Sequence, residues 1–450
     1  MARRVLITGL GPITGLGIGI DANWQAMLLG RSAIAPIQAF DASAFPCTLG
    51  AEVKDFKVQA YVPKSYRKAI KVMARDIELA VAAADLAARD AGLVTKGTLS
   101  EEGATTYPPR RFGANIGAGL IAADLDELTG ALVEARDDHG QFDFAKWGAQ
   151  GMGHLTPLWL LKYLPNMLAC HVTIIHDAQG PSNTITCAEA SASLSIGEAL
   201  RVIQRGDADA SFCGGAESKL NPMAYLRRIL NGGLNITSNP PEGDPAKAVR
   251  PFCATAAGTV VGEGGGLVIL EAAETFEQRK ASSGDGTPPR AYAAVLGFGA
   301  SQSIHPQARN LKPDPQGKGV ALAISAALRD AGVSPDAIDL IVPLGSGVAE
   351  FDQAEAAALR QVFSTRLAQV PVVSLVPMVG NCGAGMGGIG AAIAAKTLAE
   401  QTLPATLNCD QPLPGLRAAT APSRPAELRH VLTYTTGLGG QNAALVLGRA

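Results

Sequence analysis

The sequence has little charge of either sign and few aromatic residues, and these shortages narrow the classes of protein it can belong to. Of its 450 residues, 17% are charged and 5% are aromatic, and the formal net charge is −2. A nucleic-acid-binding protein normally carries a strong basic excess, so that class is excluded. A disordered chain is poor in apolar residues, whereas 47% of this chain is hydrophobic. No run of about 18 apolar residues is present, and we therefore expect no membrane span.

Paired or clustered cysteines are also absent. The chain has seven cysteines, an odd number, and none of them forms a Cys-x-x-Cys spacing. This excludes a disulfide framework and a common zinc site, and a reducing cytoplasm is the expected compartment. His171 and His176 lie in an apolar run that we predict to be a strand, where residues five apart point to opposite faces. We expect no metal site.

A complete dinucleotide-binding fingerprint is missing as well. The predicted strand 5–8 runs into Gly9 and Gly11, as such a fingerprint requires. However, the position three residues after Gly11 is Thr14, and no acidic residue closes a matching unit about 20 residues on. No nucleotide or other cofactor is expected.

What the chain does have is an alternation of apolar β-branched runs with alanine-rich helical runs, which predicts a layered α/β fold. Residues 79–93 and 321–333 both end a helix with Arg-Asp-Ala-Gly, and Gly92 and Gly332 are placed as C-terminal caps. Each helix is followed by an apolar strand that runs into glycine. The shared order predicts an internal duplication of about 200 residues. The predicted strands are 5–8, 111–116, 210–214, 267–271, 340–343 and 443–447; the predicted helices are 76–91, 190–205, 320–331 and 387–399; residues 137–153 are expected to form a mobile excursion.

The most informative segment is 164–200, LPNMLACHVTIIHDAQGPSNTITCAEASASLSIGEAL. We expect an apolar strand that leads through Gly180-Pro181-Ser182 into a second strand and then into a helix of small residues. This segment resembles the β-ketoacyl-acyl carrier protein synthases, or ketosynthases, whose nucleophile lies at the start of such a buried helix. Further motifs follow in the family's order: Ile7-Thr8-Gly9-Leu10-Gly11, Gly206-Asp207-Ala208-Asp209, Gly214-Gly215-Ala216-Glu217, Arg250-Pro251-Phe252, Gly262-Glu263-Gly264 and Gly437-Leu438-Gly439-Gly440-Gln441-Asn442.

The resemblance covers nearly the whole chain and implies a duplicated thiolase-like fold. This fold is α/β, with five layers in the order α-β-α-β-α and two similar halves. We place the N-terminal half at residues 1–255 and the C-terminal half at residues 256–450. The duplication inferred from the repeated helices agrees with this fold.

The positions that carry the family's chemistry hold other residues. The nucleophilic cysteine of the family lies seven residues after the serine of Gly-Pro-Ser, which is Glu189 in this chain. The first catalytic histidine is replaced by Leu344, and the second, after Met-x-Gly, is replaced by Asn381. A lysine of the family is replaced by Val376. The place of the gating phenylalanine is Leu438.

These replacements remove the groups that a Claisen condensation needs. A thiolate must hold the acyl chain as a thioester, and imidazole donors must stabilise the enolate formed when a malonyl group loses CO₂. Glu189 is a poor nucleophile toward thioesters, and Leu344 cannot donate a hydrogen bond. Cys187, two residues from the expected position, is an alternative nucleophile, but we interpret it, like Cys382, as a buried apolar residue. We interpret Glu189 as a carboxylate that caps its helix or pairs across a dimer.

This pattern of loss is similar to that of the chain length factors, the ketosynthase-like subunits that pair with an active ketosynthase in type II polyketide synthesis. The leading hypothesis is therefore a non-catalytic subunit, a pseudoenzyme, that forms a heterodimer with an active ketosynthase in polyketide, polyene or fatty-acyl elongation. The alternatives are a priming enzyme that decarboxylates malonyl-carrier protein and a homodimeric scaffold that binds acyl carrier protein. The resemblance also implies that basic residues dock the acidic carrier protein, although a solvated helix face explains the cluster equally well. These residues are Lys64, Arg67, Lys68 and Lys71.

Overall fold

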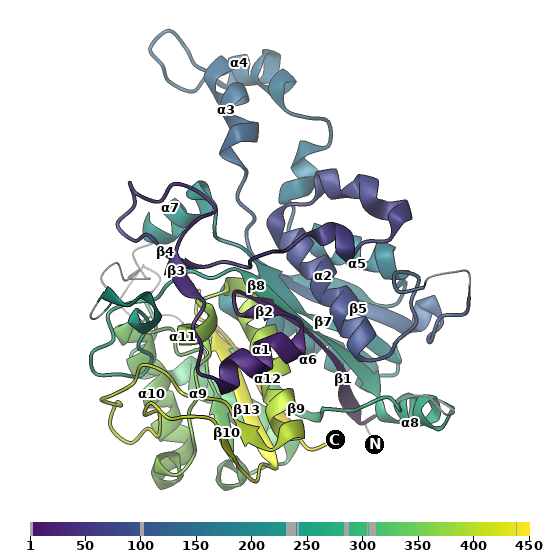
Figure 1. The fold of residues 1–450 in the computed structure, drawn as a ribbon, viewed down its shortest axis with the longest axis vertical. Helices are drawn as coiled ribbons and strands as arrows, with labels where there is room; N and C mark the ends of the chain where they lie inside the picture. Colours follow the sequence, from purple (N-terminus) through teal and green to yellow (C-terminus); the bar gives the residue numbers. More distant parts are fainter. Residues whose placement is uncertain are drawn as a thin grey trace.

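The structure of the protein, a computed structural model, describes residues 3–99, 103–230, 240, 243–282, 288–303, 305, 312–437 and 439–450. A continuous sheet of ten strands runs through the described part of the chain, with helices between and outside its two halves (Figure 1). Both termini lie on the same side of the body (Figure 1).

The N-terminal half of the sheet has the strand order β6-β5-β7-β8-β1. β5 pairs with β6 and β7 in parallel, whereas β7 with β8 and β8 with β1 are antiparallel pairs. Nearly all residues of β1, β5, β7 and β8 are buried, as expected for strands covered on both faces. The bounds are β1 Val5–Thr14, β5 Phe112–Ala118, β6 Ser182–Ile185, β7 Ala210–Glu217 and β8 Gly264–Ala272.

The C-terminal half repeats this arrangement with the order β10-β13-β14-β9. β10 and β13 are parallel, and β13 with β14 and β14 with β9 are antiparallel. A parallel bridge from Ile341 to Val372 stands where β6 stands in the first half. The two halves join where Leu6 and Ile7 of β1 pair with Ala294 and Ala293 of β9. The bounds are β9 Ala293–Gln302, β10 Leu340–Val342, β13 His430–Thr436 and β14 Gln441–Gly448.

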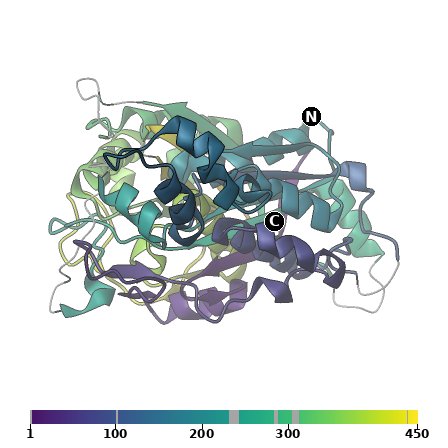
Figure 2. The same cartoon turned by 90° about the horizontal axis from the view of Figure 1, so that it is seen from above.

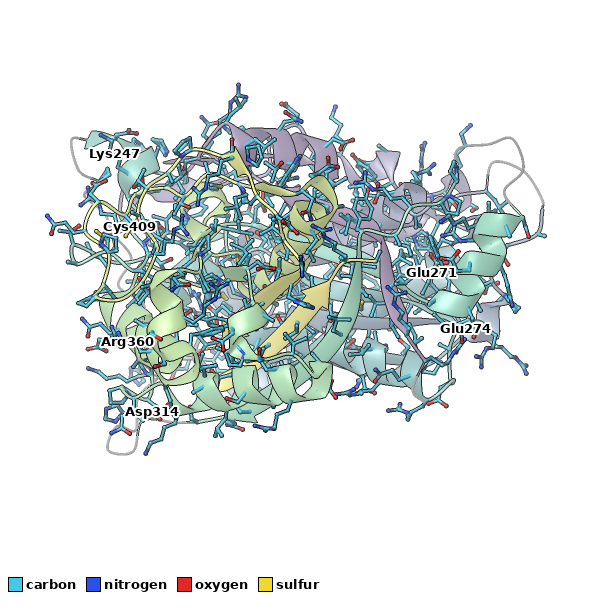
Figure 3. The ribbon with its side chains drawn as sticks, turned by 90° about the horizontal axis from the view of Figure 1, so that it is seen from below. Lys247, Glu271, Glu274, Asp314, Arg360 and Cys409 are labelled. Carbon is cyan, nitrogen blue, oxygen red and sulfur yellow. The ribbon has the colours of Figure 1, made fainter. Side chains whose placement is uncertain are left out.

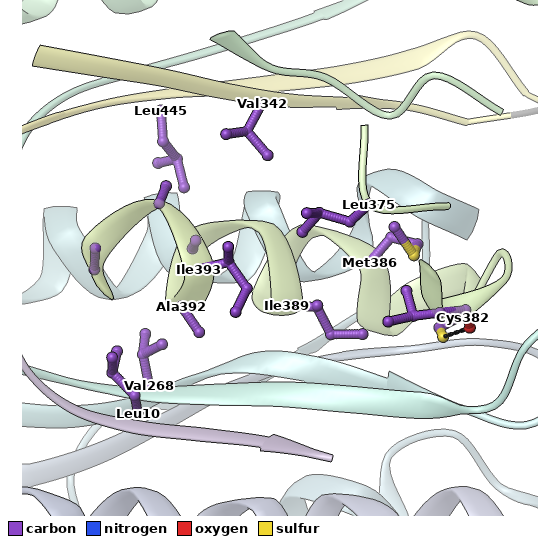
Figure 4. Close-up of a cluster of buried hydrophobic side chains, with 14 of the residues drawn as sticks. Leu10, Val268, Val342, Leu375, Cys382, Met386, Ile389, Ala392, Ile393 and Leu445 are labelled. Carbon is purple, nitrogen blue, oxygen red and sulfur yellow. Dashed lines mark hydrogen bonds between the residues drawn. The ribbon is translucent and has the colours of Figure 1, made fainter. Parts of the chain in front are cut away.

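The helices complete the expected layers. α6 and α12 pack against each other and against strands of both halves, which places them between the two parts of the sheet. α12 is apolar on all sides, and Figure 4 shows Leu10 and Val268 on one side of it and Val342 and Leu445 on the other. α2 and α5 cover the outer face of the N-terminal half, and α9 and α10 lie outside the C-terminal half. The bounds are α2 Arg75–Asp90, α5 Met167–His176, α6 Ser191–Gln204, α9 Lys318–Ala331, α10 Ala349–Phe363 and α12 Met386–Glu400.

The five-layered, duplicated α/β fold is thus confirmed. The division between residues 255 and 256 stays a prediction. β8 follows that point in the sequence and pairs with β1 and β7 of the N-terminal half. The remaining helices are α1 Ile20–Leu28, α3 Leu125–Glu134, α4 Phe144–Ala149, α7 Pro222–Leu230, α8 Ala273–Ala281 and α11 Val376–Val379; the short strands are β2 Gly17–Ile18, β3 Ile34–Pro36, β4 Leu49–Ala51, β11 Thr402–Leu403 and β12 Arg424–Pro425; the 3₁₀ helices used below are η2 Lys64–Val72, η6 Ala188–Ala190 and η11 Gly383–Gly385.

In the N-terminal half, the contact between β1 and α2 depends on a glycine and an aspartate. A Cβ atom at Gly11 would lie 2.0 Å from the carbonyl oxygen of Ala83, so only glycine allows the strand to approach the helix this closely. The neighbouring Leu10 N–H donates to the carboxylate of Asp90 at 2.7 Å. Asp90 belongs to the Arg-Asp-Ala-Gly end of the helix, so the repeated motif ties this helix to its strand.

The contact between β9 and α9 is built in the same way. A Cβ atom at Gly299 would lie 2.1 Å from the carbonyl oxygen of Ala323. The Phe298 N–H donates to the carboxylate of Asp330 at 2.9 Å. The repeat found in the sequence is therefore a repeat of one strand-helix contact.

One prediction about local structure is wrong. The apolar run that contains His171 and His176 is the helix α5, not a strand, and both histidines are buried. Residues 137–153, expected to form a mobile excursion, include α4 and a 3₁₀ turn, and their mobility stays a prediction. With α3, they belong to an arm, residues 120–164, that projects from the body (Figures 1 and 2). Within the described residues, no helix has both the length and the apolar character needed to cross a membrane.

Candidate functional site

Two equivalent turns meet at the centre of the molecule. In the N-terminal half, η6 runs directly into the buried helix α6, and in the C-terminal half, η11 runs directly into α12. The two turns are in contact. Ala188 in the first turn has a φ of 48°, a left-handed conformation that a non-glycine residue adopts only when its surroundings impose it. This sharp turn places Glu189 beside the N-terminus of α6.

Glu189 is held in a network of three side chains. It is 2% exposed, and its Oε1 accepts hydrogen bonds from Nη2 of Arg228 at 2.6 Å and from Nδ2 of Asn381 at 3.3 Å. The Oδ1 of Asn381 accepts from the Gly383 N–H at 3.0 Å, which directs the amide nitrogen toward Glu189. Burial alone would raise the pKa of Glu189, but the charge and hydrogen bond of Arg228, together with Asn381, lower it below its ordinary value. The site therefore holds a carboxylate anion in an ion pair.

The network leaves polar atoms without partners beside a cavity. Among the described residues, Oε2 of Glu189 and Nε of Arg228 are buried and form no hydrogen bond. A cavity of about 310 Å³ adjoins them, and Leu120, Lys219 and Arg227 are among the residues that line it. Cationic and acidic groups line it next to apolar ones, so the cavity is not a purely hydrophobic acyl pocket.

Leu344 and Val376 lie in a second, apolar part of the predicted site. Both are buried in the same hydrophobic cluster. Ser374 connects them, because its hydroxyl lies 2.9 Å from the carbonyl oxygen of Leu344 and accepts from the Val376 N–H at 3.2 Å. The side chains at these two positions offer no proton, no charge and no hydrogen bond.

Two buried carboxylates lie next to this part. Asp352 accepts from the Phe252 N–H at 2.8 Å, and Glu355 lies 3.3 Å from the Gly345 N–H. Neither forms an ion pair with a described residue. Burial raises the pKa of Asp352 to about 7, and burial together with the charge of Asp352 raises the pKa of Glu355 to about 8. The resemblance implies a lysine at the position of Val376. Valine has no charge, so it supplies no counterion to Asp352 or Glu355.

The family of the chain is shown by sequence comparison. The model of the β-ketoacyl synthase N-terminal domain matches residues 2–275, and that of the C-terminal domain matches residues 292–410. The chain belongs to the β-ketoacyl synthase family. The 3-oxoacyl-[acyl-carrier-protein] synthase 2 of Coxiella burnetii is 31% identical over 451 residues, which are 99% of each chain. The enzyme of the same name from Vibrio cholerae is 31% identical, also over 99% of each chain.

Solved structures of this β-ketoacyl synthase family share the fold over the whole length. A β-ketoacyl synthase from Burkholderia phymatum has a TM-score of 0.81 and 26% identity, and 100% of both chains is covered. The ishigamide ketosynthase/chain length factor has a TM-score of 0.80 and 27% identity, again with 100% of both chains covered. Both similarities place this chain within the thiolase-like ketosynthases and leave its role among them to the chemistry of the site.

In this member of the β-ketoacyl synthase family, neither candidate cysteine has the surroundings of an activated nucleophile. Burial raises the pKa of Cys187, and its N–H, not its thiol, bonds the Ser191 hydroxyl. Burial also raises the pKa of Cys382, whose thiol donates to the Val379 carbonyl. A thiol becomes a good nucleophile when a base or positive charge lowers its pKa, and neither contact does so. The interpretation of both as unreactive stays a prediction.

The predicted docking residues lie together on one short helix. Lys64, Arg67, Lys68 and Lys71 belong to η2, and all four are exposed. Among the described residues, none of them forms an ion pair, so their charges are available to a partner. Leu438, the predicted gate position, lies outside the described residues.

Sequence reasoning missed Arg228. It lies on α7, where the buried residues are Ala224, Tyr225 and Arg228, the spacing of one helix face. The available signal was the spacing, because Arg228 lies on the same helix face as Ala224 and Tyr225. Its partner, Glu189, is 39 residues away, and no local pattern connects the two.

Proposed function

We propose that the chain is a non-catalytic, chain length factor-like subunit that pairs with an active ketosynthase in type II polyketide, polyene or fatty-acyl chain elongation. The observation that carries this proposal is the network at Glu189. A carboxylate stands in the place of the nucleophile, and Arg228 and Asn381 satisfy it.

This network opposes each step of condensation. An anion paired to a guanidinium is a weak nucleophile, and a carboxylate has no sulfur with which to hold the acyl chain as a thioester. Enolate formation from a malonyl group develops negative charge that needs positioned donors, and Leu344 supplies none. One N–H of the Asn381 amide donates to the anion of Glu189, whose negative charge disfavours the build-up of a second negative charge at this place. The same argument weakens the priming decarboxylase, because decarboxylation also passes through the enolate.

A subunit role is supported by surfaces that a single chain leaves uncovered. β6 is at the end of the sheet, pairs with β5 on one side, and has Ser182 and Asn183 exposed. An unpaired edge is a template for another strand, which the second chain would supply in the proposed pair. The arm beside it has many large apolar side chains in solvent, which marks an interaction surface. These are Leu120, Leu125, Val133, Phe142, Phe144, Met152, Leu158 and Leu160.

The similarity to the ishigamide ketosynthase/chain length factor is consistent with a heterodimer. Binding of acyl carrier protein fits the exposed cations of η2, and a reducing cytoplasm remains the expected compartment. The relatives named as 3-oxoacyl-[acyl-carrier-protein] synthase 2 set the alternative to be tested, a chain that turns over substrate by itself.

The test uses mass spectrometry of malonyl- and acyl-carrier protein incubated with the purified chain, and then with an active ketosynthase added, which is first sought among the genes adjacent to that of the chain. We expect no decarboxylated or condensed product from the chain alone, and products of defined length from the pair. A control pair, in which the ketosynthase's own nucleophilic cysteine is replaced by alanine, is expected to be inactive. Turnover by this chain alone, or by the control pair, would contradict the proposal. Size-exclusion chromatography of the mixture separates the remaining alternative, because a homodimeric scaffold would not associate with the ketosynthase.

A further inference from the structure

We propose that Cys253 and Cys409 form an oxidisable thiol pair, in which a small hydroperoxide oxidises Cys253 and Cys409 then converts it to a disulfide. The pair lies in a hydrophobic cluster with residues of α9 and α10, apart from the network at Glu189. Its chemistry does not depend on the proposed subunit role.

The segments that carry Cys253 and Cys409 are paired with each other. Cys253 forms an antiparallel bridge with Pro412, and the Ala254 N–H donates to the Gln411 carbonyl at 2.8 Å. The Cys409 thiol lies 3.6 Å from the carbonyl oxygen of Phe252, the residue before Cys253. Figure 3 shows Cys409 on the loop between β11 and β12, toward the periphery of the body. The Cys409 thiol therefore lies at the peptide group next to Cys253, although the two cysteines are 156 residues apart in the sequence.

A relay of hydrogen bonds favours the thiolate of Cys253. Nη1 of Arg250 donates to Oγ1 of Thr255 at 2.7 Å, and this oxygen lies 3.2 Å from Sγ of Cys253. Because a guanidinium only donates, the threonine oxygen accepts from it, which leaves the threonine proton available to the sulfur. Burial would raise the pKa of Cys253, but the Thr255 hydroxyl and nearby backbone N–H groups lower it.

Burial outweighs hydrogen bonding at five of the other thiols, including Cys47, where a hydrogen bond from Tyr225 acts in the opposite direction. Burial raises the pKa of Cys47, Cys187, Cys213, Cys382 and Cys409. Since the thiolate is the form that reacts with peroxides, Cys253 is the thiol expected to react ahead of these.

The position of the pair selects the class of oxidant. Cys253 is 3% exposed, and the next two residues along the chain, Ala254 and Thr255, are exposed. A hydroperoxide can reach a sulfur one layer below the surface, whereas a protein disulfide is too large to approach it.

The reaction balances in two steps. The Cys253 thiolate attacks a peroxide oxygen, the O–O bond breaks, and Cys253 sulfenic acid and an alcohol or water form. The Cys409 sulfur then attacks the sulfenyl sulfur, and the hydroxyl leaves as water with the Cys409 proton. In sum, two thiols and one hydroperoxide give one disulfide, one alcohol and one water. The negative charge of Cys253 is one cause, after burial, of the raised pKa of Cys409, and its conversion to a neutral sulfenic acid removes that cause.

The test is treatment of the full chain with hydrogen peroxide, followed by thiol counting and peptide mass spectrometry. The two cysteines lie on different tryptic peptides, so a disulfide joins peptides that are otherwise separate. We expect the free-thiol count to fall by two, a linked Cys253–Cys409 peptide, and reversal by dithiothreitol. In Cys409→Ser, Cys253 is expected to remain as a sulfenic acid that dimedone captures, and in Cys253→Ser, Cys409 stays reduced.

Cys187→Ser is the control and is expected to leave the linked peptide unchanged. The proposal is overturned if dimedone labels Cys187 or Cys170 while Cys253 stays reduced. It is equally overturned if oxidised protein contains no linked peptide although Cys409→Ser folds with the circular dichroism spectrum of the unchanged chain.

Discussion

The two halves of the molecule share their strand-helix contacts but differ in the polar groups they bury. In both halves, a glycine lets the first strand approach a helix, and an aspartate at the end of that helix accepts a backbone N–H of the strand. α5 and α10 hold the same place in the strand-helix order, yet α5 buries His171 and His176 and α10 buries Asp352 and Glu355.

The comparison teaches which interactions the fold requires. The glycine and aspartate contacts act on the backbone, so they persist in both halves, whatever the chemistry of the neighbouring site. The residues at the turns before α6 and α12 contact each other instead, and Glu189 and Asn381 can be paired without altering either helix. Loss of a catalytic group at these turns is therefore compatible with an intact fold.

The largest expected effect is on the shared contact itself. Gly11→Val and Gly299→Val each force a side chain into a backbone oxygen about 2 Å away. Both variants should lose the native state or be destabilised by more than about 3 kcal/mol, which urea unfolding monitored by circular dichroism measures. Gly153→Ala, where a Cβ meets nothing within 4 Å, is the control. Equal damage in both halves would sharpen the comparison, whereas tolerance in one half would break it.

The next effect is at the junction of the halves. Glu189→Met leaves Arg228 buried without a counterion, and we expect a loss of about 3 kcal/mol in the free energy of unfolding. Arg228→Met leaves the carboxylate unpaired and should cost a similar amount. The double variant, Glu189→Met with Arg228→Met, is expected to be close to the unchanged chain, because an apolar pair needs no desolvation of charge. Additive losses in this cycle would show that the two side chains are not coupled.

The sequence predicted the repeated helix, though not its contact with the strand before it, because the signals of the helix are local. The helical period, the Arg-Asp-Ala-Gly end and the glycine cap all lie within one short segment. α5 was mistaken for a strand because its β-branched residues favour strands, and packing against α2 overrides that preference. Arg228 was missed for another reason: its contact with Glu189 is tertiary, and no property of the α7 sequence names a partner. The alignment with the ketosynthases located Glu189 and Asn381, but only the fold shows that they bond each other.

A smaller effect is expected in the pH dependence of stability, where α5 and α10 should act in opposite directions. The folded pKa of Glu355 is about 8, above its ordinary value of 4.5, so the folded state keeps a proton that the unfolded state loses. The free energy of unfolding therefore falls as the pH rises from about 4.5 to about 8. Glu355→Gln should remove about 1–3 kcal/mol of the loss between pH 6.5 and 8.5, measured by urea unfolding at each pH.

The matched variant on α5 is His171→Gln. Burial lowers the pKa of His171 to about 4 from 6.5, so the unfolded state binds the proton first and stability falls as pH drops below about 6.5. We expect His171→Gln to reduce the loss of stability below pH 6.5. The change in stability between pH 6.5 and 8.5 should stay the same as in the unchanged chain. If both variants altered the same interval, the contrast between the two helices would not hold.

The smallest effect on stability, with a large one on binding, is expected on the surface of the N-terminal half. Reversing the charges of Lys64, Arg67, Lys68 and Lys71 to glutamate changes only exposed side chains, so the unfolding free energy should move by less than about 0.5 kcal/mol. The affinity for acyl carrier protein, measured by surface plasmon resonance at low salt, should fall about tenfold or more, because an acidic partner is steered by these charges. Four reversals in the C-terminal half, at Lys318, Arg329, Arg360 and Arg429, are the control with the same change in net charge. Equal losses for both sets would show a response to net charge alone, whereas a loss confined to the first set would assign carrier docking to η2 and to one half of the duplication.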